Sequence, residues 1–120
     1  MSRVRNSFTA VLAVSLIAGL AGCAPAKLDV SDVAGIIDVR TPAEFRKSHI
    51  AGAINIDYSS LDFLANSTSL IKTDKYLVYG ENSDQATAAA ADLISIGISD
   101  ITNLGSLEDA LNVLPIGIGK

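Results

Sequence analysis

Short runs of β-branched and aromatic residues recur along the chain, and the segments between them carry patterns that suit helices. Each run has about the length of a strand that is covered on both faces. The predicted strands are Leu28–Val30, Ile36–Val39, Ala53–Ile56, Tyr76–Tyr79 and Ile101–Leu104. The predicted helices are Pro42 to about Ser48, Leu61–Asn66, Ala86–Ile96 and Leu107–Val113. This alternation predicts an α/β domain with a parallel sheet and right-handed crossovers.

The predicted helices carry recognisable start and stop signals. Thr41 suits the N-cap, Pro42 the first helical position and Glu44 the third, which together make a capping box. Ser106 suits the N-cap of the last helix. Gly97 suits the end of the longest one, because glycine adopts the left-handed conformation that often closes a helix.

The first residues have the pattern of a secretory signal peptide. Arg3 and Arg5 make a basic start, and the apolar or small run Phe8–Leu20 is too short for a permanent membrane span. Small residues then lead to Cys23. This segment resembles the lipobox of bacterial lipoproteins. The resemblance implies that residues 1–22 are removed and that Cys23 is acylated and becomes the new N-terminus.

The expected mature protein has three parts. Residues 23–27 hold the lipidated cysteine and a short tether, residues 28–113 form one domain, and residues 114–120, with one proline and two glycines, form a flexible tail. The membrane is thus an expected partner through the lipid on Cys23, with the domain on its periplasmic or extracellular side.

Cys23 is the single cysteine of the chain, so its lipidation leaves neither a free thiol nor a disulfide. Two alternatives are a buried apolar residue in an uncleaved segment and a catalytic thiol, although no basic residue flanks Cys23 to activate it. A typical zinc site needs several cysteine and histidine ligands, and this chain has one of each. We therefore expect no metal and no other cofactor.

The charge balance argues against nucleic acid as a partner. All 13 acidic residues follow residue 22, but two of the nine basic residues, Arg3 and Arg5, precede it. Seven basic against 13 acidic residues give the mature part a formal charge of −6. Binding to nucleic acid or to anionic lipid headgroups requires a basic surface, so membrane attachment would depend on the lipid.

Three segments resemble the rhodanese-like domain family. The first is IIDVRTPAEFRKSHIAGAINID at Ile36–Asp57, in which an Asp-Val-Arg follows a strand and an HIAGA turn follows a helix. The others are LVYGENSDQATAAAADL at Leu77–Leu93 and IGISDITNLGS at Ile96–Ser106. The resemblance covers about Ile36–Leu111. It implies a small rhodanese-like α/β fold, with a five-stranded, mostly parallel sheet flanked by helices on both faces.

Active members of this family are sulfurtransferases, and the resemblance locates their nucleophile. It implies a cysteine at the end of the fourth strand, heading a loop of about six residues whose N–H groups surround the thiolate. Only a thiolate is both nucleophilic at neutral pH and able to carry transferable sulfur. In this chain the cysteine position is Gly80, and the remaining loop positions are Glu81, Asn82, Ser83, Asp84 and Gln85. The nucleophile is missing, and two acids stand where an anionic donor would bind.

Other polar residues of the matching segments have structural interpretations as well as catalytic ones. Asp38, Arg40 and Glu44 resemble an acid/base cluster, but at this spacing an arginine held by an aspartate is expected to be structural. His49 is either a general base or, as we expect, a residue that caps or packs the turn before Gly52.

Hydroxyl groups near the loop are weak candidates for a nucleophile. Ser83 and Thr87 lie in or beside it, but the sequence offers them no adjacent base, and Ser83 suits a helix N-cap. Tyr58, Tyr76 and Tyr79 are expected to be core and rim aromatics.

Taken together, these features predict a membrane-anchored lipoprotein whose rhodanese-like domain is inactive and acts as a binding or scaffold module at the cell envelope. An envelope protein docking at Gly80–Gln85 is the expected partner, because the N–H groups of the loop suit a carboxylate or a backbone segment. The alternative for the loop is that Glu81 or Asp84 closes it by accepting those hydrogen bonds. The alternative function is a sulfurtransferase with residual or unconventional activity.

Overall fold

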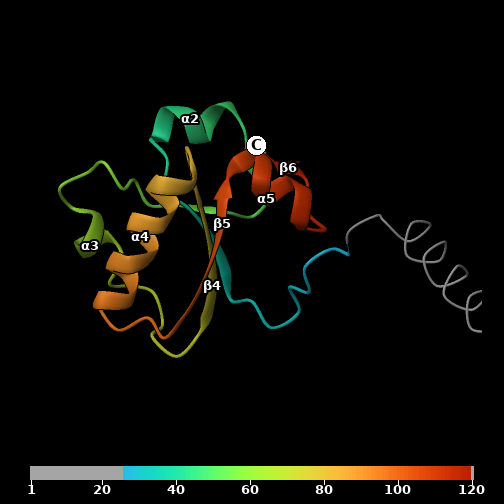
Figure 1. Cartoon of the computed structure of the whole chain (residues 1–120). Helices are drawn as coiled ribbons and strands as arrows, with labels where there is room; N and C mark the ends of the chain where they lie inside the picture. Colours follow the sequence, from blue (N-terminus) through green and yellow to red (C-terminus); the bar gives the residue numbers. More distant parts are fainter. Residues whose placement is uncertain (1–25, 120) are drawn as a thin grey trace, which may run out of the picture.

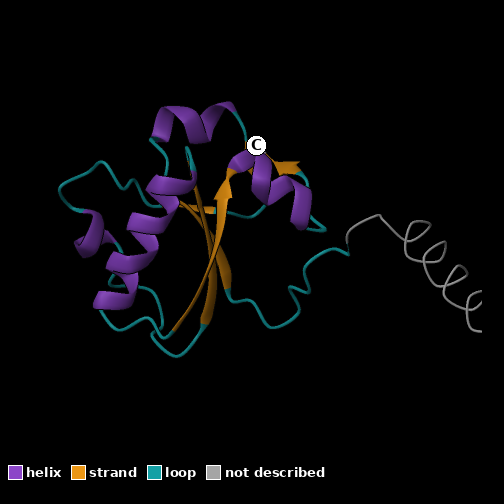
Figure 2. Cartoon of the chain, viewed as in Figure 1, coloured by secondary structure: helices purple, strands orange, loops and turns teal. Residues whose placement is uncertain are grey.

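The computed structural model describes residues 26–119, and its centre is a parallel sheet of four strands in the order β3-β1-β4-β5 (Figures 1 and 2). The strands are β1 (Gly35–Asp38), β3 (Ile54–Asn55), β4 (Lys75–Gly80) and β5 (Asp100–Ser106). The helices are α2 (Pro42–Lys47), α3 (Phe63–Asn66), α4 (Ser83–Ser95) and α5 (Leu107–Val113). The predicted fold class is therefore confirmed, with four parallel strands in place of five. The predicted signal peptide, Cys23 and the first part of the tether lie outside the described residues.

The two faces of the sheet carry separate apolar clusters because successive strand residues point to opposite sides. Ile37 and Val78 belong to the cluster that also contains Phe63 of α3 and Leu93 of α4. Leu77 and Tyr79 belong to the cluster on the other face. Its buried members are Ile36, Ile50, Leu77, Tyr79, Leu104, Ala110 and Leu114. Helices α3 and α4 thus cover one face of the sheet, and α5 covers the other.

A second, two-stranded antiparallel sheet joins the middle of the chain to its end. Strand β2 (His49–Ile50) pairs with β6 (Ile118–Gly119), and Ile50 lies opposite Ile118. Leu114 is buried, and Ile116 packs against the same apolar cluster. Residues 114–119, predicted to form a flexible tail, are thus part of the folded domain, since Leu114 and Ile116 pack against the core and β6 pairs with β2.

The expected first strand at Leu28–Val30 is wrong. These residues lie outside both sheets, and the Leu28 N–H donates to the carbonyl of Val113 at the end of α5 (2.7 Å). Leu28 and Val30 are half-buried against the cluster beneath α5. Within residues 26–119 this short apolar run has no neighbouring strand to pair with, and its side chains pack against the core instead.

Two helix starts differ from prediction for local reasons. Helix α4 begins at Ser83, three residues before the expected start, because the side chain of Asn82 accepts a hydrogen bond from the Gln85 N–H and acts as N-cap. Helix α3 begins at Phe63 and has a single turn, after a turn at Leu61. The predicted cap at Ser106 of α5 is confirmed. None of the helices within residues 26–119 is both long and apolar enough to cross a bilayer.

Candidate functional site

A cavity of about 350 Å³ opens at the carboxyl ends of β1, β4 and β5. Its lining comes from the ends of these strands and from α2 and α5: Arg40, Glu44, Gly80, Glu81, Ser106, Leu107, Glu108 and Leu111. In open parallel sheets this edge is where ligands bind, because strand ends and helix starts converge there. The cavity is therefore lined by Gly80, where the nucleophile was expected from the sequence.

Gly80 is the last residue of β4 and is buried. It pairs with Ser106 of β5 across an irregularity in the strand register, a feature that often adjoins active sites. A Cβ atom on Gly80 would lie 2.9 Å from Gln85 Oε1, 3.1 Å from the Ala86 nitrogen and 3.3 Å from Val39 Cγ2. A side chain at position 80 would therefore displace the flexible end of Gln85 and press closely on the backbone of Ala86.

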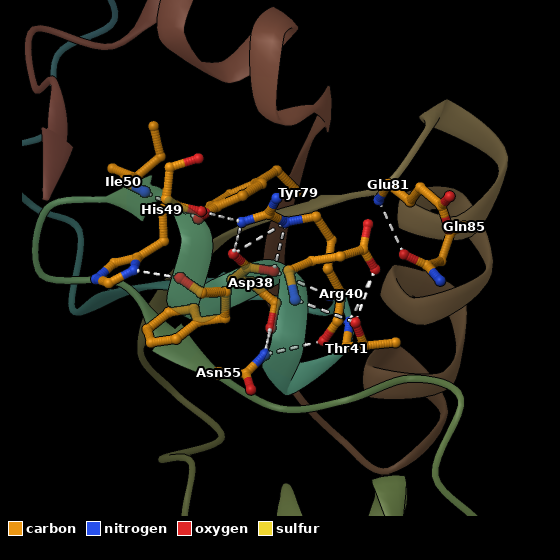
Figure 3. Close-up of polar contacts among 12 residues, drawn as sticks. Asp38, Arg40, Thr41, His49, Ile50, Asn55, Tyr79, Glu81 and Gln85 are labelled. Carbon is orange, nitrogen blue, oxygen red and sulfur yellow. Dashed lines mark hydrogen bonds and ion pairs between the residues drawn. The ribbon is translucent and has the colours of Figure 1, made fainter. Parts of the chain in front are cut away.

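The segment after Gly80 is short and internally bonded. Only Glu81 and Asn82 connect β4 to α4, so the other predicted loop residues, Ser83, Asp84 and Gln85, form the first turn of the helix. The Glu81 N–H donates to Gln85 Oε1 (2.9 Å; Figure 3), and the Gln85 N–H donates to Asn82 Oδ1 (2.8 Å). The side chains that accept these N–H groups are thus amides, and not the carboxylates of Glu81 or Asp84.

A buried ion pair lies beside the cavity. Arg40 Nη2 is 2.7 Å from Asp38 Oδ2, and Arg40 Nε donates to both carboxylate oxygens (Figure 3). Arg40 Nη2 also donates to the carbonyl of Ser48 (2.6 Å), and its guanidinium carbon lies 5.6 Å from the Tyr79 ring centre. Burial lowers the pKa of Arg40, but the hydrogen bonds and charge of Asp38 outweigh this effect and raise it overall. Arg40 thus joins the end of β1 to the start of β2 as a permanent cation.

Asn55, which sequence reasoning missed, holds the same corner. Its Nδ2 donates to the carbonyls of Asp38 (3.0 Å) and Arg40 (2.9 Å; Figure 3). The signal in the sequence was a polar residue inside an apolar run, but its partners lie 15 and 17 residues away. Only the pairing of β1 with β3 brings these groups together.

Tyr79 has a structural hydroxyl group. The Ile50 N–H donates to Tyr79 Oη (3.0 Å), and the Tyr79 side chain is fully buried. Burial raises the pKa of Tyr79, and the negative charge of Asp38 raises it further, so the phenol remains neutral well above its ordinary range. Tyr79 was expected to be a core aromatic, and its polar contact to β2 was not foreseen.

The remaining predicted site residues lie around the cavity or away from it. Glu44 lines it and completes the capping box with Thr41, which is confirmed. His49 stacks on Phe45 with ring centres 3.7 Å apart, and its Nδ1–H donates to the Phe45 carbonyl (2.8 Å). Gly52 forms a turn at φ +83°. His49 and Gly52 do not line the cavity, and their contacts are those of turn packing.

The hydroxyl candidate Thr87 is also tied to structure. Its Oγ1 donates to the carbonyl of Ser83 (2.8 Å) and accepts a hydrogen bond from Asn103 Nδ2 (2.9 Å). Neither partner can act as its base, because a carbonyl or an amide does not take up the hydroxyl proton at neutral pH. Among residues 26–119, no three histidine, cysteine or acidic side chains gather as a metal site.

The cavity is acidic. Glu44, Glu81 and Glu108 line it, and the one cation among its lining residues, Arg40, is already paired with Asp38. Carboxylates that line a cavity repel an anionic ligand and would disfavour a thiolate there. Leu107 and Leu111 add an apolar wall.

The family model described as "Rhodanese-like domain" matches residues 21–111. Over 69 residues the chain is 37% identical to the thiosulfate sulfurtransferase GlpE of Pseudomonas fluorescens, covering 58% of this chain and 62% of that protein. It is 32% identical over 73 residues to the thiosulfate sulfurtransferase PspE of Escherichia coli, covering 61% of this chain and 70% of that protein. The chain spans about half to three fifths of the length of several curated relatives that it matches.

Solved structures show the same fold. The Rhodanese_3 like domain of the Alr3790 protein from Anabaena superposes with a TM-score of 0.63 at 25% identity, covering 72% of this chain and 98% of that one. Its near-complete coverage matches the single domain seen here. By its sequence match over residues 21–111 and by its fold, this chain belongs to the rhodanese-like domain family.

Proposed function

We propose that the protein is a membrane-anchored lipoprotein whose rhodanese-like domain no longer transfers sulfur and binds a partner protein at the cell envelope. The observation that carries this proposal is Gly80 at the end of β4, where the family resemblance implies the nucleophile. A persulfide intermediate needs a thiol, and the only cysteine of the chain, Cys23, stands in the lipobox. The anchor rests on the signal-like residues 1–22 and on that cysteine.

The occupied space and the charge of the cavity support the loss of activity. Gln85 Oε1 fills the volume next to Gly80, and Glu44, Glu81 and Glu108 surround the place where an anionic donor would sit. These are two independent departures from what sulfur transfer from thiosulfate requires. The exposed first turn of α4, with Ser83 and Asp84 at its start, offers helix N–H groups to a partner's carboxylate or backbone.

A sulfur-transfer assay tests the inactive state. We expect the soluble domain, from Ala24 onward, to form no thiocyanate from thiosulfate and cyanide above the uncatalysed rate, and to transfer no sulfur to dithiol acceptors. The Escherichia coli relative serves as the positive control. Turnover above background would establish the second candidate, a residual sulfurtransferase, which the 32–37% identity to two thiosulfate sulfurtransferases favours.

The anchor and the partner need separate experiments. Cys23→Ser is expected to move the protein from the membrane fraction to the soluble one and to abolish labelling by a fatty-acid analogue.

For the partner, a photocrosslinking residue at exposed Asp84 should give a discrete adduct in cells, whereas the same residue at exposed Asp100, at the opposite end of the sheet, should not. Equal labelling at both positions would contradict a docking role for the loop.

A further inference from the structure

We propose that one face of the domain lies flat against the lipid bilayer and fixes its orientation. We call it the α5–β6 face, and it consists of Ala51, Gly52, Asn112, Val113 and residues 115–118. This inference deepens the proposed function, because it rests on the lipid anchor at Cys23. It assigns the bilayer surface as the occupant of a patch whose side chains are largely exposed among the described residues.

The attachment point of the tether selects this face. Lys27 Nζ donates to the carbonyl of Asn112 (3.0 Å), and the Leu28 N–H donates to the carbonyl of Val113 (2.7 Å). The chain therefore reaches the folded domain at the last turn of α5. Four residue steps separate Cys23 from Lys27, and an extended chain covers at most roughly 14 Å over that length. An acylated Cys23 thus holds the end of α5 within that reach of the headgroups.

The composition of the face suits a bilayer surface. Val113 is 38% exposed and Ile118 is 47% exposed, and residues 110–119 include no charged residue. Ala51 and Gly52, on the neighbouring turn, are exposed and small, and the Ala51 N–H donates to the Gly117 carbonyl. In a mature chain with a formal charge of −6, this is a surface that approaches anionic headgroups without like-charge repulsion.

The other exposed apolar surface lies on the far side of the domain. Leu61 is fully exposed and Leu64 is 41% exposed, and both belong to the α3 region, which covers the opposite face of the sheet from α5. In Figure 1, α3 stands at one side of the domain and the chain leaves toward the N-terminus at the other. Apolar exposure alone does not indicate which of the two surfaces faces the bilayer. The attachment of the tether at the end of α5 favours the α5–β6 face.

The anchoring strength comes from the acyl chains, since two partly exposed side chains contribute little to membrane affinity. The face instead decides which way the tethered domain is turned. With the α5–β6 face on the bilayer, α3 and its exposed leucines point away from the membrane. The domain then has one fixed orientation, and without the contact it would rotate freely on its tether.

Depth-dependent quenching on the full, lipidated chain tests the orientation. The protein is placed in vesicles of phosphatidylethanolamine with a minor fraction of phosphatidylglycerol, and an environment-sensitive fluorophore is attached at Val113→Cys or Ile118→Cys. Acylation removes the thiol of Cys23, so each introduced cysteine is the only reactive one. Labels at 113 and 118 should shift to shorter wavelength and lose most of their emission to headgroup-nitroxide lipids.

Matched labels at Leu61→Cys and Leu64→Cys should keep their emission. Equal quenching on both sides, or stronger quenching at 61 and 64, would overturn the orientation. Mass spectrometry of the N-terminal peptide distinguishes a missing lipid anchor from a wrong orientation of the anchored domain. An unacylated Cys23 would overturn the anchor and the orientation together, whereas an acylated chain with unquenched labels at 113 and 118 would overturn the orientation alone.

Introducing negative charge on the face provides a second readout. In lipidated protein labelled at Ala51→Cys, the pair Val113→Glu and Ile118→Glu should abolish quenching while the membrane-bound fraction stays unchanged. The matched pair Leu61→Glu and Leu64→Glu should leave the quenching intact. Circular dichroism verifies that each variant is folded. Persistent quenching in the first pair would overturn the contact.

Discussion

At the scale of single residues, Gly80 has little room for a side chain. Gly80→Ala places a Cβ 3.1 Å from the Ala86 nitrogen and displaces Gln85 from the Glu81 N–H. We expect this overpacking to lower the free energy of unfolding by about 1–3 kcal/mol in urea denaturation. Gly117→Ala is the control, because no atom lies within 4 Å of its Cβ position and its φ is negative. Equal stability of the two variants would contradict the packing argument.

Tyr79 is a second residue whose effect is measurable alone. Tyr79→Phe leaves the buried Ile50 N–H without its acceptor and should cost about 1–3 kcal/mol at neutral pH. The folded-state pKa of Tyr79 is raised above the ordinary 10.0, so its contribution is fully present below pH 10.0 and is lost as the pH rises further. The stability gap between wild type and Tyr79→Phe should therefore narrow above that pH. A constant gap would show that the folded and unfolded phenols ionise alike, and a growing gap would show that folding lowers the pKa of Tyr79.

At the scale of elements, Arg40 joins β1 to the α2–β2 corner. Arg40→Ala leaves the carboxylate of Asp38 buried without its partner and removes the bond to the Ser48 carbonyl, which should cost about 3–5 kcal/mol in unfolding free energy. Arg46→Ala, on the exposed side of α2, should cost less than about 1 kcal/mol. Similar losses in both variants, measured by urea denaturation, would show that Arg40 acts only as a surface charge.

The C-terminal segment is an element of the fold in its own right. Leu114 is 2% exposed beneath α5, so Leu114→Ala should cost about 2–5 kcal/mol through the cavity it leaves. The neighbouring Val113→Ala, at a half-exposed position, should change stability by about 0.5 kcal/mol or less. Thermal unfolding of the two variants distinguishes a packed segment from a loose tail, for which both changes would be small.

At the scale of the whole molecule, residues 23–120 carry a formal charge of −6, which bears on the proposed membrane attachment. The soluble domain from Ala24 onward should not sediment with phosphatidylglycerol vesicles at any ionic strength, because its 13 acidic residues outnumber its seven basic ones and like charges repel. The full lipidated chain should sediment with the same vesicles. Salt-sensitive binding of the soluble domain would reveal an electrostatic contribution that the composition does not predict.

The elements that the sequence predicted well are those fixed by short-range interactions. The continuous apolar runs around Ile36–Val39 and Tyr76–Tyr79 suffice for central strands, and Thr41 with Glu44 satisfies a helix start within a few residues. The prediction failed where long-range partners decide. Leu28–Val30 has the pattern of a strand but lies beside no strand of the described part of the chain with which it could pair. Residues 114–119 contain turn-forming residues, yet Ile118 and Gly119 pair with β2.

By itself, the sequence determined the family, the absence of a cysteine at Gly80 and the local capping signals, because each of these depends on residue identity or on neighbours a few positions away. Only the tertiary structure decided what occupies the space beside Gly80. Gln85 occupies that space because helix α4 begins early, at Ser83, and turns this amide back onto β4. The Tyr79 contact to Ile50, 29 residues away, and the position of the tether on α5 likewise follow from packing, which no local pattern encodes.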